Sequence, residues 1–192
     1  MAEGLTQEIY RDDSTKSVNV QNILAGIVEG FTGYATMSAD SAFTDFQRKI
    51  QAIIDANLKK QYATEIENNQ KFLSENKKKE GVVTLPSGLQ YKVLIPGTDE
   101  RPADSVSVKC HYEGKLIDGS KFDSSYDNGE PMVLNNLKEN SAIPGFMEAI
   151  RLMTYGSKWE VYIPENLAYG SRGMGKIKPF STLIFTIELL KK

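Results

Sequence analysis

The sequence V-S-V-K-C-H-Y-E-G-K-L-I-D-G-S-K-F-D-S-S-Y, residues 106–126, decides the fold of this chain and the kind of site that it carries. A half-buried strand is predicted at its start, because apolar residues alternate with polar ones at Val106, Val108, Cys110 and Tyr112. Asp118-Gly119 is typical of a hairpin turn. Asp123 then follows Phe122, and nothing nearby resembles a nucleophile, a metal cluster or a phosphate loop. Such a site can wrap an apolar group, exclude water and offer one or two hydrogen bonds, which is what rotation about an Xaa-Pro amide requires.

Four blocks of this sequence resemble the FK506-binding-protein family of peptidyl-prolyl cis-trans isomerases. They are residues 108–126, I-P-G-F at 143–146, L-A-Y-G at 167–170 and P-F-S-T-L-I-F-T-I-E-L-L at 179–190. The stretch F-L-S-E-N-K-K-K-E-G-V-V-T-L-P-S-G-L-Q-Y at 72–91 is similar to the junction in the bacterial two-domain branch, the macrophage-infectivity-potentiator type. The resemblance implies an α+β fold, in which an α-helical dimerisation segment with a long helix precedes a curved antiparallel β-sheet wrapped around one short helix.

The resemblance also implies the residues of the site. The implied catalytic residues are Tyr112, Phe122, Asp123 and Tyr169, and the implied substrate-binding residues are Met132, Leu134, Ile143, Phe146, Ile177 and Phe185. Phe146 would form a floor under the proline ring, and Ile143 would offer its backbone N–H. Plain core packing is the alternative for the aromatic residues. For Asp123 a function is favoured, because a carboxylate flanked by apolar residues costs free energy unless it has a partner.

Three features depart from the family pattern. Phe146 stands where the family usually has tryptophan, and the segment 135–140 is longer than usual. The loop tip M-G-K-I-K at 174–178 carries two lysines, and Lys178 takes a position that proline commonly holds. We therefore expect the substrate preference to differ from that of other members.

The N-terminal part of the chain is helical in pattern. Apolar residues recur at helical spacing over 20–31, and a second pattern runs from Phe43 to Leu73 without Gly or Pro between Ser38 and Gly81. The second pattern predicts one helix of roughly 40 residues, a rod of about 60 Å. Such a rod has more apolar surface than one short helix covers, so we expect a homodimer through residues 18–80. A stalk that packs only on its own C-terminal domain is the alternative.

Gly81 predicts the end of this helix, and Pro86-Ser87-Gly88 opens a region of alternating strand patterns. The predicted domains are a helical dimerisation segment, 1–80, and an isomerase domain, 81–192. One short helix is expected after Pro144, where Phe146, Ala149, Ile150 and Met153 form a single apolar stripe.

Composition excludes several other classes of function. The net charge is only −2, with no strongly basic half, so nucleic acid is not an expected partner. No apolar run approaches the roughly 18 to 20 residues of a membrane span, and residues 1–15 lack a signal-peptide pattern. We therefore expect a soluble protein, with cytoplasm and periplasm both open. His111 is the only histidine and Cys110 the only cysteine, which gives a metal site little support.

The expected function is a peptidyl-prolyl cis-trans isomerase, or rotamase, that assists protein folding and needs neither metal nor cofactor. Proline-containing polypeptides would be its clients, and FK506- or rapamycin-like macrolides are candidate ligands by family resemblance. The alternative from another class is a non-catalytic peptide-binding chaperone module with the same fold. A purely structural dimerisation protein would leave the cluster of aromatic residues and Asp123 without a role.

Overall fold

The computed structural model describes residues 39–98, 100–137 and 141–191, with side chains from residue 44 onward. The chain forms two compact units, Met1–Gln61 and Tyr62–Lys192. In the described part of the first unit lies α3 (Ala39–Gln61), and the second unit begins with α4 (Ala63–Asn76). The helix predicted over 20–31 lies outside the described residues. No helix within the described ranges is long and apolar enough to cross a membrane.

The single long helix expected from the sequence is wrong, because the helical pattern is interrupted at Tyr62. This residue leaves the helical conformation, with φ −103° and ψ 23°, and its ring lies 6.4 Å from that of Phe180. Further along α4, the ring of Phe72 packs 6.0 Å from that of Tyr162 in the sheet. These contacts place α4 in the same compact unit as the sheet, Tyr62–Lys192.

The second unit is built on a seven-stranded sheet in which every recorded strand pair is antiparallel. Its strands are β1 (Val82–Thr84), β2 (Gln90–Ile95), β3 (Val108–Leu116), β4 (Lys121–Ser124), β5 (Met132–Leu134), β6 (Lys158–Ile163) and β7 (Leu183–Leu189). The order is β1-β2-β6-β7-β3-β4, and β5 also pairs with β3. Long β3 therefore has β7 along one edge and both β4 and β5 along the other.

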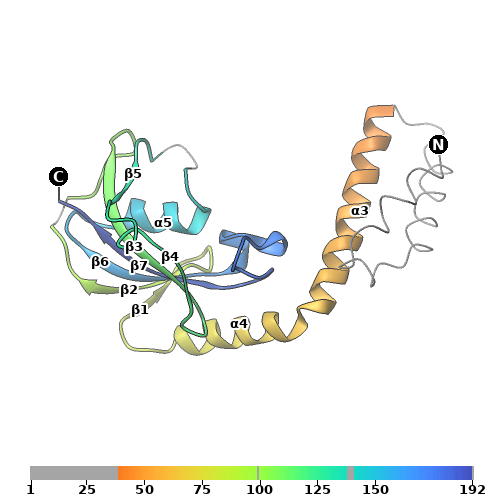
Figure 1. Cartoon of the computed structure of the whole chain (residues 1–192), viewed down its shortest axis with the longest axis horizontal. Helices are drawn as coiled ribbons and strands as arrows, with labels where there is room; N and C mark the ends of the chain where they lie inside the picture. Colours follow the sequence, from red (N-terminus) through yellow and green to blue (C-terminus); the bar gives the residue numbers. More distant parts are fainter. Residues whose placement is uncertain (1–38, 99, 138–140, 192) are drawn as a thin grey trace. The chain divides into compact units, whose positions relative to one another are not determined.

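The core lies between the sheet and α5 (Pro144–Leu152), which the sheet curves around (Figure 1). Phe146, Ala149 and Ile150 of the predicted stripe are buried on α5, and Met153 is fully buried just after the helix. Met147, which was not part of the predicted stripe, is buried as well. Every second residue of β7 is buried, from Leu183 to Leu189. Cys110 of β3 is fully buried in the same core, and burial raises the pKa of its thiol to about 12. The predicted α+β fold is confirmed.

The sheet carries further packing around Trp159, the only tryptophan of the chain. Trp159 is 7% exposed and stacks on Tyr91 with ring centroids 4.3 Å apart. The next residues of the same strands point to the opposite face of the sheet, as alternation requires. There, Gln90 and Tyr162 are buried, and Gln90 donates to the Leu73 carbonyl of α4 at 3.0 Å. One sheet thus has α5 on one face and α4 on part of the other.

Candidate active site

A cavity of about 460 Å³ opens beside the start of α5, and all the sequence-predicted site residues except Leu134 line it. They come from distant parts of the chain: β3, β4, β5, the N-terminus of α5, the loop after β6, and β7. Five residues that were not predicted also line the cavity, namely Ser141, Ala142, Met174, Gly175 and Lys176. Asp123 and Lys176 are the charged side chains of this lining.

Four aromatic rings form the inner wall, with Phe185 at their centre. Its ring centroid lies 5.4 Å from that of Phe146, 5.5 Å from Phe122 and 5.9 Å from Tyr112. Phe122 and Phe146 meet Phe185 edge to face, at interplanar angles of 82° and 79°, an arrangement that aromatic quadrupoles favour. Phe146 and Phe185 are only 3% and 6% exposed, so they belong to the core and to the cavity at once. The two explanations offered for these residues, core packing and site, are therefore compatible.

Space for this wall depends on Gly114 of β3, which pairs with Asp123 on one side and Phe185 on the other. A Cβ atom at Gly114 would lie 2.5 Å from Cζ of Phe122 and 3.0 Å from Cε1 of Phe185. Carbon atoms in contact prefer about 3.5 to 4.0 Å. The ring of Phe122 therefore occupies the place that a side chain at residue 114 would fill.

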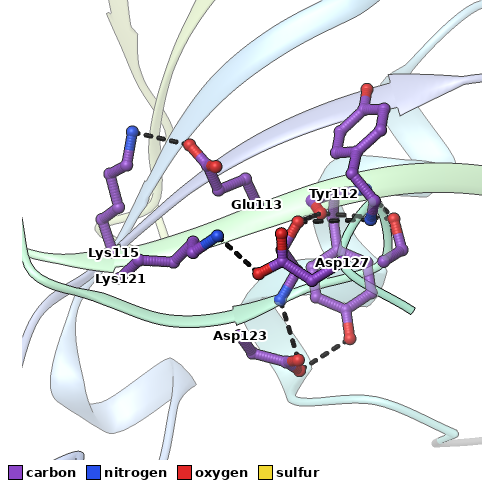
Figure 2. Close-up of polar contacts among 9 residues, drawn as sticks. Tyr112, Glu113, Lys115, Lys121, Asp123 and Asp127 are labelled. Carbon is purple, nitrogen blue, oxygen red and sulfur yellow. Dashed lines mark hydrogen bonds and ion pairs between the residues drawn. The ribbon is translucent and has the colours of Figure 1, made fainter. Parts of the chain in front are cut away.

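Asp123 lies at the rim of the cavity and holds two hydrogen bonds. Its Oδ2 accepts from the hydroxyl of Tyr112 at 2.7 Å, and its Oδ1 accepts from the N–H of Ser124 at 2.8 Å. Figure 2 shows the Tyr112 hydroxyl directed at this carboxylate, apart from the ion pairs Lys115–Glu113 and Lys121–Asp127. Asp123 is exposed, so the expected cost of burying its charge does not arise. Its role is better explained by its bond to Tyr112.

The two tyrosines of the cavity stay protonated. Burial, followed by the hydrogen bond to Asp123, raises the pKa of Tyr112 well above its usual value near 10. Burial, followed by the negative charge of Asp123, raises the pKa of Tyr169 as well. At neutral pH both phenols are therefore hydrogen-bond donors, and the Tyr112 proton is already engaged by Asp123.

The start of α5 presents a backbone donor to the cavity. Ile143 is the residue before the first turn, and its carbonyl accepts from the N–H groups of Phe146 and Met147 at 3.0 and 3.2 Å. Pro144 follows at the first helical position, where its fixed φ suits the helix. Among the hydrogen bonds recorded for the described residues, none uses the Ile143 N–H as donor. A peptide carbonyl in the cavity could accept from it.

Residues 174–177 form a tight turn at the cavity mouth. Met174 and Ile177 exchange both backbone hydrogen bonds at 2.8 Å, and Gly175 has φ +55°, as a two-residue hairpin of type II′ requires at its first central position. This geometry places Lys176 in the cavity lining, whereas Lys178 forms an ion pair with Glu65 of α4. Ile177 was an expected substrate-binding residue and lines the cavity, but the sequence did not distinguish between the two lysines of the loop.

Leu134 was expected to bind substrate, but it does not line the cavity. It is fully buried and absent from the cavity lining, because β5 pairs it with Val108 toward the interior of the sheet. Met132, on the same face of β5 but paired with Cys110, does line the cavity. The two residues share a face and differ in their position along the strand.

Comparisons with known proteins agree with this fold and with the family resemblance of the sequence. The model of the FKBP-type peptidyl-prolyl cis-trans isomerase family matches residues 98–190, and that of the domain amino-terminal to FKBP-type isomerases matches residues 2–93. A 22 kDa FKBP-type peptidyl-prolyl cis-trans isomerase of Escherichia coli is 43% identical over 170 residues, which are 88% of this chain and 81% of the relative. The outer membrane protein MIP of Legionella longbeachae is 39% identical over 178 residues, 90% of this chain and 75% of that protein.

Solved structures give the same answer. The crystal structure of FkpA from Escherichia coli matches with a TM-score of 0.65 at 32% identity, over 99% of this chain and 92% of that one. The chain therefore belongs to the FKBP-type peptidyl-prolyl cis-trans isomerases, in the branch that has an additional N-terminal domain. Its activity is the cis-trans isomerisation of peptidyl-prolyl bonds, which was the predicted function, and the alternative of a non-catalytic chaperone module is disfavoured.

Proposed function

We propose that the 460 Å³ cavity binds an Xaa-Pro segment and catalyses rotation about its amide bond by favouring the twisted form. Resonance holds the planar amide with a barrier of about 18 to 20 kcal/mol. As the bond twists, conjugation is lost and the separation of charge across the amide falls. A water-poor aromatic cavity therefore binds the twisted form better than the planar one, and this difference in binding lowers the barrier. The observation that carries the proposal is the group of four aromatic rings beside the N-terminus of α5.

The walls and the polar groups of the cavity have separate roles in this proposal. The proline ring rests on Phe146, between Tyr112, Phe122 and Phe185, with Met132 and Ile177 at the sides. The N–H of Ile143 and the hydroxyl of Tyr169 donate to carbonyl groups of the bound peptide. Asp123 fixes the hydroxyl of Tyr112 and so the orientation of its ring. No proton needs to leave or join a protein group during the reaction.

The decisive experiment measures kcat/KM on a chromogenic Xaa-Pro tetrapeptide for the parent, Asp123→Leu and Tyr112→Ala. We expect each substitution to lower kcat/KM by about tenfold or more, which is roughly 1.4 kcal/mol of transition-state binding. Asp127→Leu is the matched control, since Asp127 is an exposed carboxylate in the turn after β4 and pairs with Lys121 outside the cavity lining. Parent rates for both Asp123→Leu and Tyr112→Ala would refute the assignment of the site.

For assembly, we propose a homodimer through residues 18–80. Its support lies in α3: among residues 44–61, no side chain is fully buried, and Ile54 is 43% exposed. An apolar helix surface of this kind needs a partner. Ile50→Glu combined with Ile54→Glu should yield monomers in sedimentation, with Gln51→Glu and Asp55→Asn as a polar control on the same helix. A parent chain that sediments as a monomer at about 10 to 50 μM would exclude the dimer.

FK506- or rapamycin-like macrolides are proposed as ligands of the same cavity, because its walls are apolar and its polar groups few. Such a ligand should inhibit tetrapeptide isomerisation competitively. Lack of competition at saturating macrolide, with isomerisation intact, would remove the macrolides from the ligands without affecting the substrate proposal. The polypeptide clients follow from the same reasoning, and proline-limited refolding of a model protein is the assay for them.

A further inference from the structure

Residues 170–182, which we call the roof loop, separate two cavities. Met174, Gly175, Lys176 and Ile177 line the isomerase cavity, while Lys178, Ser181 and Thr182 line a second cavity of about 250 Å³. The opposite wall of the second cavity is α4, through Glu65, Asn68 and Asn69. Residues 116–118 complete the lining of this cavity.

A hydrogen bond joins the two ends of the roof loop, and one of its residues has a strained backbone conformation. The N–H of Phe180 donates to the carbonyl of Gly170 at 2.8 Å and so brings the two ends of the loop together. Phe180 itself has φ +62°, the left-handed conformation that L-residues other than glycine disfavour. A bulky residue keeps this conformation only where surrounding structure holds it. Tyr62, the residue before α4, is part of that surrounding structure.

Three contacts from Tyr62 and α4 hold the roof loop. The ring of Tyr62 lies 6.4 Å from that of Phe180, whose side chain is only 4% exposed. The Oδ1 of Asn69 accepts from the N–H of Thr182 at 2.7 Å, and its Nδ2 donates to the Glu65 carbonyl at 2.6 Å, which fixes the amide. Asn69 and Thr182 are 6% and 1% exposed, so water cannot readily replace this bond. The third contact is the exposed ion pair between Glu65 and Lys178, which contributes least.

We propose that α4 is a working part of the isomerase site, and that Asn69 and Tyr62 are positioning residues for the roof of the cavity. They hold Thr182 and Phe180, and through these they fix Ile177 and Tyr169, which contact the substrate. This inference rests on the proposed function of the cavity. It also moves the functional boundary: the isomerase unit begins at Tyr62, although α4 precedes the family's catalytic region.

The test compares Asn69→Ala and Tyr62→Ala with Phe72→Ala in the full chain. Phe72 is on the same helix and packs against Tyr162 of β6, so its removal weakens α4 without touching the roof loop. We expect kcat/KM on a tetrapeptide to fall by about tenfold in the two roof variants, mainly through KM, and by less than about twofold in Phe72→Ala. Thermal unfolding of each variant establishes a temperature at which all of them are folded.

A spectroscopic measurement separates positioning from general stability. The amide signals of Gly173 and Gly175 should shift in Asn69→Ala and stay at their parent positions in Phe72→Ala. Equal losses of kcat/KM in all three variants, or parent activity in both roof variants, would overturn the proposal. Asp123→Leu serves as the reference in the same series. If it loses activity while the roof variants do not, the site assignment stands and only the role of α4 is refuted.

Discussion

Gly114→Ala is the smallest change that should disable the site, because it adds one methyl group behind the aromatic wall. The backbone of Gly114 lies outside the left-handed region, so alanine fits the strand itself. The added Cβ would lie 2.5 Å from Cζ and 2.7 Å from Cε2 of Phe122. A normal carbon contact of about 3.5 Å requires the ring to retreat by about 1 Å. Gly114 is buried in the middle of β3, so the ring must move and not the strand.

The expected magnitude follows from this displacement. Overpacking of a close-packed interior costs about 1 to 3 kcal/mol of unfolding free energy. A shift of about 1 Å in a group that contacts the substrate reduces catalysis by up to roughly a hundredfold. We therefore expect Gly114→Ala to lower kcat/KM on an Xaa-Pro tetrapeptide by about tenfold to a hundredfold, while the protein stays folded at 10 °C.

The assay needs a control and a rescue. Glu113→Ala is the control, since Glu113 is the neighbouring residue, points to the other face of β3 and pairs with Lys115 at 2.6 Å. The rescue is Phe122→Leu, which removes the obstructing ring. In that background Gly114→Ala should cost less than about twofold, a coupling that a double-mutant cycle measures. Equal losses in both backgrounds would refute the steric argument, as would parent activity of Gly114→Ala.

Three further predictions concern stability and the floor of the cavity. Leu134→Ala should lower the unfolding free energy by about 2 to 5 kcal/mol in urea titrations and leave KM unchanged, because the residue is core and not cavity; a raised KM would return it to the site. Phe146→Trp should preserve or raise kcat/KM while lowering the unfolding midpoint, since a larger ring enters a site that is 3% exposed; loss of turnover would show that phenylalanine is required. Burial, and then its hydrogen bond to Glu188, raises the pKa of Tyr126 to about 12. Unfolded tyrosine loses its proton near pH 10, so the contribution of Tyr126 to stability is present below pH 10 and lost as the pH rises toward about 12. The midpoint of urea unfolding should fall less between pH 9 and 11.5 in Tyr126→Phe than in the parent, and identical slopes would contradict this.

The sequence predicted those elements of the fold that bury one face. The alternation from Val106 to Tyr112 predicted β3, and the apolar stripe after Pro144 predicted α5. β2, β6 and β7 lie in the region of strand patterns that was predicted after Pro86-Ser87-Gly88. β1 was not predicted, because its three residues include no buried one and so leave no alternation to detect. The end of α3 was missed for a different reason. Tyrosine is compatible with a helix, so the sequence gives no local signal for a break at Tyr62. The contact of Tyr62 in the fold is with Phe180, which is distant in the chain.

The candidate site was predictable in composition but not in depth or orientation. Period-two alternation assigns Met132 and Leu134 to one face, yet it cannot tell which of them reaches the cavity and which lies in the core. The same limit applies to Lys176 and Lys178, which the turn at Gly175 sends to different cavities. The family resemblance implied Asp123, and a function was favoured for it because of the cost of burying its charge, whereas it is exposed and bonded to Tyr112. Asp123 does line the cavity beside Tyr112, but the burial of its charge, which was the stated reason, does not occur.

Cys110 is a built-in probe for local unfolding of the sheet. Its thiol is fully buried on β3, which is held by β5 and β7 at this residue, and its pKa of about 12 leaves almost no thiolate at neutral pH. A thiol reagent therefore reacts only with molecules in which the centre of the sheet has separated. Because this is the only cysteine, a single rate of labelling follows that event without any added probe. Pulse labelling during turnover would then report whether the sheet remains closed while prolyl bonds rotate in the cavity beside it.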